Sequence, residues 1–213
     1  MKTKLLTITI AISITIAALL GGCSTIDKAQ NVYGAVRAGY GANSAFNSAK
    51  DLRDATPAFQ GYTSVVAYAE LQPHEGDVAS IKAAFADNLR YLVDAHAQAL
   101  GARLQSCVSI QRCGGRVLAL QFTEDAYGGS FAEKITMGNK LKGRLQYVDQ
   151  GTGSVIAEKR IEGVSNYAEV LGLARGSILG AMLKSYPNSG VQSEALENIP
   201  AVKPGYERLL ASN

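Results

Sequence analysis

The stretch KLKGRLQYVDQGTGSVIAEKRIEGV, from Lys140 to Val164, decides the fold that the sequence predicts. Its first half alternates apolar or small residues with polar ones: Leu141, Gly143, Leu145 and Tyr147 against Lys140, Lys142, Arg144 and Gln146. A period of two is typical of a strand with one buried and one solvated face. Asp149 to Ser154 has turn composition, and Val155 to Val164 can return beside the first strand. The stretch therefore predicts an antiparallel β-hairpin.

A long helix and two further strands are predicted before the hairpin. From Val78 to Leu100 apolar side chains recur at steps of three and four and form one stripe, and Asp77 precedes them as a helix N-cap. Gly61 to Leu71 and Arg116 to Thr123 are short runs typical of strands. Because a strand, a helix and a second strand usually join through a right-handed crossover, we expect these two strands to be parallel neighbours.

A second helix is predicted after Asn166, which can cap its first turn. Gly172, Gly176 and Gly180 follow one another at intervals of four residues and so lie on one side of it. Each Gly inside a helix costs about 1 kcal/mol relative to Ala, so three in one row suggest that something packs very close to them. We expect the protein's own sheet in that place, with another chain as the alternative.

Together these elements predict an α/β fold with a small mixed sheet, in the order β-α-β-β-β-α, and with two helices packed on one face. The predicted α/β domain spans residues 61–186. Residues 23–60 are rich in small side chains and are predicted to form a partly helical tether. Residues 187–213, with scattered prolines, are predicted to be an extended or disordered tail.

Residues 1–22 have the pattern of a signal peptide. Lys2 and Lys4 are followed by an uncharged, mostly apolar run from Leu5 to Leu20. This run of 16 residues is shorter than the ~20 that a membrane-spanning helix needs, so a retained transmembrane anchor is the weaker alternative.

The apolar run ends in Leu20, Gly21, Gly22 and Cys23, which resemble the lipobox of bacterial lipoproteins. The resemblance implies that the leader is removed, that the mature chain begins at Cys23, and that this cysteine carries acyl chains such as palmitate. Ser24, in place of Asp, is similar to what is seen in lipoproteins sorted to the outer membrane. We therefore expect a lipid-anchored protein on the periplasmic face of the outer membrane.

Two cysteines, Cys107 and Cys113, remain in the mature chain and predict a disulfide in an oxidising compartment. Five intervening residues can form a loop that brings the two Cα atoms within the roughly 4.4 to 6.8 Å that a disulfide needs. Zinc binding and redox catalysis are weaker alternatives, since a zinc site would need two more ligands and neither His74 nor His96 is near in sequence. We expect no metal and no other cofactor.

The charge balance argues against binding to nucleic acid. Two of the 21 basic residues, Lys2 and Lys4, lie before Cys23, so the mature chain has 19 basic against 18 acidic side chains. Attraction to phosphates needs a concentrated excess of Lys and Arg.

One local row of basic residues, Lys140, Lys142 and Arg144, lies on one face of the predicted hairpin. It is opposed by Glu158, Arg160 and Glu162 of the returning strand. This pattern predicts cross-strand ion pairs, with contact to a membrane surface as the alternative.

The residues that could support catalysis are few. His96 lies on the apolar stripe of the long helix, where we expect a neutral, hydrogen-bonded packing residue. His74, with Glu75 and Asp77 in one turn, is a weak metal candidate. Glu124 and Asp125 are adjacent at a strand end, so their side chains should point to opposite faces and both should be solvated. We expect a protein that is not an enzyme.

The order of these pieces resembles a group of bacterial outer-membrane lipoproteins of unknown function. Their α/β domain is similar to that of the curli-secretion lipoprotein and to the N-terminal domain of TolB. The resemblance covers roughly Gly61 to Tyr186, and its most specific piece runs from Lys140 to Gly163. It implies a protein that binds, braces or assembles envelope complexes. The cysteine loop and the glycine-rich last helix depart from that pattern.

The function expected from the sequence is that of a non-catalytic cell-envelope lipoprotein. It would brace or help to assemble a larger secretion, transport or surface-polymer complex, with other envelope proteins or copies of itself as partners. The alternative is a small-molecule or lipid-binding lipoprotein that serves a transporter, which would require an apolar pocket of about 300 Å³ or more. An envelope hydrolase built on one of the histidines is the third and weakest hypothesis.

Overall fold

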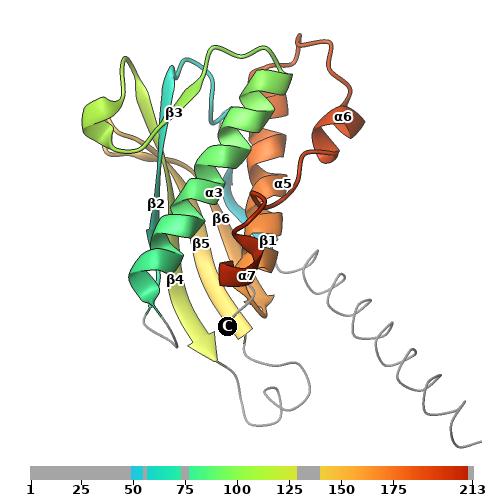
Figure 1. The fold of residues 1–213 in the computed structure, drawn as a ribbon. Coiled ribbons are helices and arrows are strands. Elements are labelled where there is room, and N and C mark those ends of the chain that lie inside the picture. The colour runs from blue at the N-terminus through green and yellow to red at the C-terminus, as the bar shows by residue number, and fades with distance from the viewer. Residues whose placement is uncertain (1–48, 55–56, 73–76, 129–139, 211–213) are drawn as a thin grey trace, which may run out of the picture. The chain divides into compact units, whose positions relative to one another are not determined.

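A mixed sheet lies at the centre of the part of the chain that the computed structural model describes, residues 49–54, 57–72, 77–128 and 140–210. These residues belong to the compact unit Ser44–Asn213. Their sheet has six strands in the order β1-β6-β5-β4-β2-β3 (Figure 1). The strands are β1 (Ala49–Asp54), β2 (Ser64–Glu70), β3 (Gln105–Cys107), β4 (Val117–Gly128), β5 (Lys140–Asp149) and β6 (Val155–Val164).

The predicted hairpin and crossover are both confirmed. β5 and β6 pair antiparallel, with Tyr147 opposite Ala157. β4 pairs antiparallel with β5 on one side and parallel with β2 on the other, so β2 and β4 are the two parallel neighbours that the sequence predicts.

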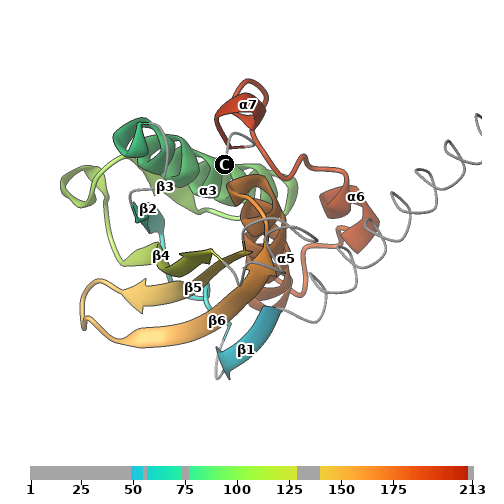
Figure 2. The same ribbon diagram turned by 90° about the horizontal axis from the view of Figure 1, so that it is seen from below.

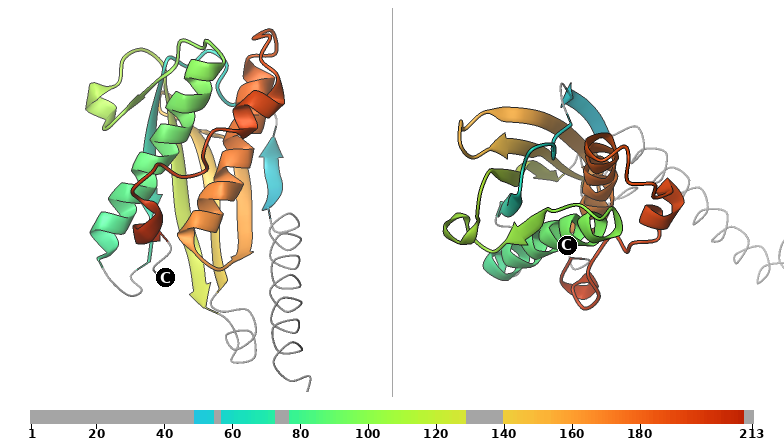
Figure 3. Two further views of the ribbon diagram at one scale, coloured as in Figure 1. Left: turned by 45° about the vertical axis from the view of Figure 1, so that its right-hand side comes forward. Right: turned by 90° about the horizontal axis from the view of Figure 1, so that it is seen from above.

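Two long helices cover one face of the sheet, α3 (Val78–Ala99) and α5 (Tyr167–Ser185). Figures 2 and 3 show both helices on the same side. Asp77 caps α3, as predicted, because its carboxylate accepts hydrogen bonds from the backbone N–H groups of Ala79 and Ser80 at 3.1 and 3.3 Å. The α/β fold class with two helices on one face is therefore confirmed.

The core lies between the sheet and the two helices. Phe85 of α3 packs against Phe122 of β4 and Tyr167 of α5, with ring centroids 4.9 and 5.8 Å apart. Gly143 of β5 is required by this packing, since an added Cβ would stand 2.5 Å from the Phe122 ring and 2.7 Å from the Thr123 carbonyl oxygen. The buried apolar face of the hairpin is therefore interrupted where an aromatic ring needs the space.

Three segments differ from their sequence predictions. The predicted order lacks β3, a short strand that pairs parallel with β2 at the edge of the sheet. Within residues 23–60 the structure has a strand, β1, paired antiparallel with β6 at the edge of the sheet, where we expected a tether of partly helical character. Within residues 187–213 it has two short helices, α6 (Ser193–Glu197) and α7 (Glu207–Leu210), where we expected an extended or disordered tail. Leu196 and Leu210 are fully buried and hold this segment against the domain, a long-range contact that local composition does not reveal.

The carboxylate of Asp149 joins the hairpin turn to two other elements. Its Oδ1 accepts hydrogen bonds from the backbone N–H groups of Gly151 and Thr152, at 2.8 and 3.1 Å, and so closes the turn. Its Oδ2 accepts from the Tyr62 hydroxyl at 2.7 Å, just before β2, and from the Arg116 guanidinium at 2.6 Å, just before β4. The Arg116 guanidinium also lies over the Tyr62 ring, 4.4 Å from its centroid.

This network lowers the pKa of Asp149 and raises the pKa of Tyr62, and both shifts keep Asp149 ionised and Tyr62 protonated. Hydrogen bonds from Tyr62 and then from Arg116 lower the pKa of Asp149. Burial, followed by the hydrogen bond to Asp149, raises the pKa of Tyr62 to about 12. Asp149 is only 3% exposed, so its charge is stable there because all its partners are present.

We predict that Asp149→Asn lowers the melting temperature at neutral pH. We also expect the melting temperature of this variant to decrease less between neutral and acidic pH than that of the wild type. Because the folded-state pKa of Asp149 is lowered, its contribution is complete above its unfolded pKa near 4 and is lost as the pH drops below that value. Tyr62→Phe removes one hydrogen bond to a charged group and should cost about 1.5 kcal/mol. Thermal unfolding between pH 3 and pH 7 measures both effects. The control is Glu194→Gln on exposed α6; equal acid sensitivity of wild type and Asp149→Asn would contradict the prediction.

Candidate interaction surface

Helix α5 presents a row of bare backbone to the outside. Its inner side is buried through Val170, Ala174, Ile178 and Met182, among others. On the other side, a Cβ added at Gly172, Gly176 or Gly180 would meet no atom of the described chain within 4 Å. We call these three glycines the glycine ridge.

The expectation that the protein's own sheet packs closely against the glycine ridge is wrong. Gly172 and Gly176 are exposed and Gly180 is half-buried. The sheet supports α5 through larger residues on the inner side of the helix, so the ridge is left outside the core. No contact within the described chain explains why glycine stands at these three positions.

A groove of about 240 Å³ runs beside the ridge. Gly176 and Gly180 form its helix side, and Tyr147 and Ala157 of the hairpin form its floor. The Tyr147 hydroxyl and Ser177 Oγ lie 2.8 Å apart and link the floor to the helix. Charged side chains of three elements border the groove: Arg53 of β1, Glu158 and Lys159 of β6, and Lys184 of α5.

The predicted basic row lies on the sheet face that the helices leave uncovered, but its ion pairing differs from the prediction. Arg144 makes a bidentate pair with Asp125 of β4, with its Nε 3.0 Å and its second guanidinium nitrogen 2.8 Å from the carboxylate oxygens. On the β6 side Arg144 stands opposite Arg160, because the hairpin register aligns these two residues. Lys142 is exposed, and Lys140 is half-buried at the start of β5.

Glu124 and Asp125 do point to opposite faces, yet only one of them is solvated. Asp125 is exposed and holds Arg144. Glu124 is 4% exposed and accepts a hydrogen bond from the Tyr167 hydroxyl at 2.6 Å and from the Gln72 backbone N–H at 3.1 Å. The expectation that Glu124 is solvated is therefore wrong, because β4 carries it under the N-terminal end of α5, where Tyr167 can reach it.

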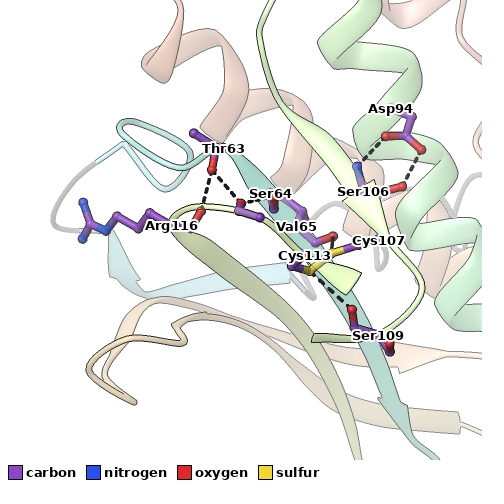
Figure 4. The surroundings of a disulfide bond; sticks show 10 residues. Thr63, Ser64, Val65, Asp94, Ser106, Cys107, Ser109, Cys113 and Arg116 are labelled. Atoms are coloured by element: carbon purple, nitrogen blue, oxygen red, sulfur yellow. Dashed lines mark hydrogen bonds between the residues drawn. A yellow bond between two sulfur atoms is a disulfide. The ribbon is translucent and has the colours of Figure 1, made fainter. Parts of the chain in front are cut away.

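The disulfide between Cys107 and Cys113 is formed, with a Cα–Cα distance of 5.6 Å. It closes a short loop between β3 and β4 that contains one turn of 3-10 helix, Ile110–Arg112. Figure 4 shows the residues around it. The bridge therefore joins the two ends of a connection and lies outside the hydrophobic core.

His96 is a packing residue, as predicted, and its side chain is fully buried on α3. Backbone groups of Leu92 and Leu196 lie beside the ring, but neither ring nitrogen makes a hydrogen bond of ordinary geometry to a described residue. Burial, followed by the positive charge of Arg175 on α5, lowers its pKa. Arg175 donates hydrogen bonds to the carbonyl oxygens of Leu196, at 2.9 Å, and of Glu197, so the imidazole lies beneath the attachment of α6.

Several predicted features fall on residues that the structure does not describe. Cys23, the leader and His74 lie outside the described residues. Within the described ranges there is no group of three or more His, Cys, Asp or Glu side chains placed to hold a metal ion. Over the same ranges, none of the helices has the length and apolar character that a membrane crossing requires.

Comparison with known proteins gives low similarity. No protein-family model matches the chain, and no curated protein matches it. Among solved structures, it is similar to a PelC dodecamer from Paraburkholderia phytofirmans, with a TM-score of 0.40 and 13% identity over 63% of this chain and 96% of that one. A variant of the same dodecamer with one substituted residue has a TM-score of 0.36 and 12% identity, over 63% of this chain and 95% of that one. These values are too low to assign a common function.

We predict that His96 makes the domain less stable as the pH falls below about 6.5, the pKa of an unperturbed histidine. Its folded-state pKa is lowered, so the unfolded chain binds the proton more readily, and the stabilisation present above that pH is lost in weak acid. This residue alone can lower the free energy of unfolding by up to about 1.4 kcal/mol per pH unit. Denaturant unfolding of wild type and His96→Phe at pH 7.5 and pH 5 measures it. Identical pH dependence of the two proteins would refute it.

Proposed function

We propose that this chain is a non-catalytic cell-envelope lipoprotein, anchored through Cys23 to the periplasmic face of the outer membrane. Its α/β domain braces or helps to assemble a larger secretion, transport or surface-polymer complex by contacts with other envelope proteins or with copies of itself. The observation that carries the proposal is the Cys107–Cys113 disulfide in the folded domain.

The disulfide supports the proposal because it is independent of the N-terminal motif. Disulfides persist in oxidising compartments such as the periplasm and are rare in the cytosol. The Leu20 to Cys23 motif, which resembles a lipobox, points to the same side of the membrane from a different part of the chain. Two features with separate physical origins therefore agree on export.

The glycine ridge supports a role in contacts between proteins. Three glycines inside a helix each destabilise it by about 1 kcal/mol relative to Ala, and here no contact within the described chain offsets that cost. Bare helix backbone allows another helix or strand to approach closely. The ridge and the charged groove beside it are therefore the surface where we place a partner.

The alternative function, binding of a small molecule or lipid for a transporter, has less support. It would need an apolar pocket of about 300 Å³ or more between sheet and helices. The groove beside α5 is smaller, about 240 Å³, and has charged residues on its border. A hollow of about 380 Å³ lies elsewhere, between α3 and the segment around α6, and is a shallow surface feature.

The anchor is tested by mass spectrometry of the protein purified from membranes of the native host. We expect the mature N-terminus at Cys23, with the mass of the acyl chains on that residue, and the intact disulfide. A Cys23→Ser variant should accumulate with its leader uncleaved, which serves as the control. A native protein with its leader intact, or with an unmodified Cys23, would refute the proposal.

The contact surface is tested by the double substitution Gly172→Ala and Gly176→Ala. Because the added methyl groups meet no atom of the described chain, the isolated protein should become more stable by about 1 to 2 kcal/mol. The same methyl groups should reduce crosslinking of the acylated protein to its partners or to itself in membranes. The control is Gln98→Ala on the exposed side of α3. A double variant that is more stable and still crosslinks like wild type would remove the glycine ridge from the interface.

A further inference from the structure

The disulfide loop carries an exposed apolar tip. Only three large hydrophobic residues are exposed in the described part of the chain, and two of them, Val108 and Ile110, lie within this seven-residue loop. Val108 is 65% exposed and Ile110 is 36% exposed. Single exposed apolar residues are common on protein surfaces, but two in one short projecting loop form a local patch.

The base of the loop is held on both sides by hydrogen bonds and by the disulfide. Ser106 donates hydrogen bonds from its backbone N–H and its hydroxyl to Asp94 of α3, at 2.9 and 2.5 Å (Figure 4). On the other side the hydroxyls of Thr63 and Ser64 donate to the Gly114 carbonyl oxygen, at 3.0 and 2.6 Å. The disulfide then fixes the distance between the two sides.

The charged residues of the chain segment that carries the tip are basic, although the Asp94 carboxylate of α3 lies at its base. From Gly101 to Arg116 the chain contains three arginines and no acidic residue. Arg116 is paired with Asp149. Arg103 and Arg112 are exposed, and neither has a carboxylate within ion-pair distance in the described part of the chain. The loop therefore presents two apolar side chains together with one cation of its own, Arg112, and Arg103 lies just before β3 in the same chain segment.

We propose that this tip, formed by Val108, Ile110 and Arg112, docks on an anionic lipid surface, with Arg103 before β3 as a further cation of the same segment. Apolar side chains that enter the headgroup boundary, together with nearby cations that attract anionic lipids, are the chemistry of interfacial membrane binding. The loop projects from the sheet between β3 and β4 (Figure 1), and the positive charge of Arg112 complements anionic lipid. Docking would orient the domain on the membrane to which its anchor holds it.

The inference rests on the proposed lipid anchor, because the anchor is what brings the domain to the membrane. The binding of the tip to anionic lipid does not depend on the anchor. Cys23 and Ala49 are 26 positions apart in the sequence, and a fully extended chain of that length spans at most about 90 Å. The tip would bind anionic vesicles even in a chain without acyl groups. Failure of the anchor and failure of the tip can therefore be told apart.

The absence of Trp from the chain allows a direct test. Val108→Trp in the mature chain with Cys23→Ser creates a protein with a single tryptophan at the tip and no acylation site. On vesicles of phosphatidylcholine with phosphatidylglycerol we expect a blue shift of its fluorescence and quenching by brominated lipid. High salt should weaken both, because it screens the attraction of the arginines. The control is Leu209→Trp on α7, a position of similar exposure to Ile110.

Loss-of-function variants complete the test without a bulky probe. Replacing both Val108 and Ile110 by Ser should weaken vesicle binding at least about tenfold, since each apolar side chain that leaves water contributes on that scale. Arg103→Gln with Arg112→Gln should remove the preference for anionic over zwitterionic vesicles. Circular dichroism and an intact disulfide establish that each variant is folded.

Three outcomes would overturn the proposal. The first is that the fluorescence of the Val108→Trp protein does not shift on anionic vesicles. The second is that the Leu209→Trp control shows an equal shift, because the signal would then not come from the tip. The third is that the double Ser variant binds vesicles like wild type.

Discussion

The carboxylate of Asp149 is the interaction on which the arrangement of the sheet depends. It closes the turn of the β5-β6 hairpin through two backbone N–H groups, and the same carboxylate accepts from Tyr62 and Arg116 at the starts of β2 and β4. The parallel pair β2-β4 is formed by segments far apart in the chain, so its alignment cannot be set by a short turn. A single buried anion that needs partners from all three elements favours one register and disfavours others.

The two long helices cover only one face of the sheet, and this explains where the chain has surfaces available to other molecules. α3 and α5 cover one face of the sheet (Figure 2). The opposite face carries the ion pair between Arg144 and Asp125. The glycine ridge lies on the outer side of α5, away from the core, and the disulfide loop projects where β3 leads into β4 (Figure 1). The uncovered sheet face, the glycine ridge and the disulfide loop do not contribute to the main core. Packing of the core therefore does not constrain which residues stand there, and they are available for contacts with other molecules.

Local patterns predicted the regular elements well and the long-range contacts poorly. The alternation from Lys140 to Asp149 and the stripe from Val78 to Leu100 reflect burial on one side of a single element, so they can be interpreted without the rest of the fold. The edge strand β1 pairs with a strand more than a hundred residues later, and α6 is held to the domain through its buried Leu196. Glu124 has an ordinary solvated pattern in sequence and becomes buried only because Tyr167 of α5 lies above it.

The sequence alone predicted the hairpin, the two main helices with their caps, the parallel neighbours and the pairing of Cys107 with Cys113. Each of these depends on the periodicity of apolar residues, on turn chemistry or on a short distance along the chain. Only the tertiary structure decided which side of α5 faces the core, that Gly143 makes room for Phe122, and that Val108 and Ile110 remain outside. The physical reason is that a side chain's burial depends on what other elements bring to it. Three glycines at intervals of four residues have the same sequence pattern whether a sheet packs against them or they are exposed.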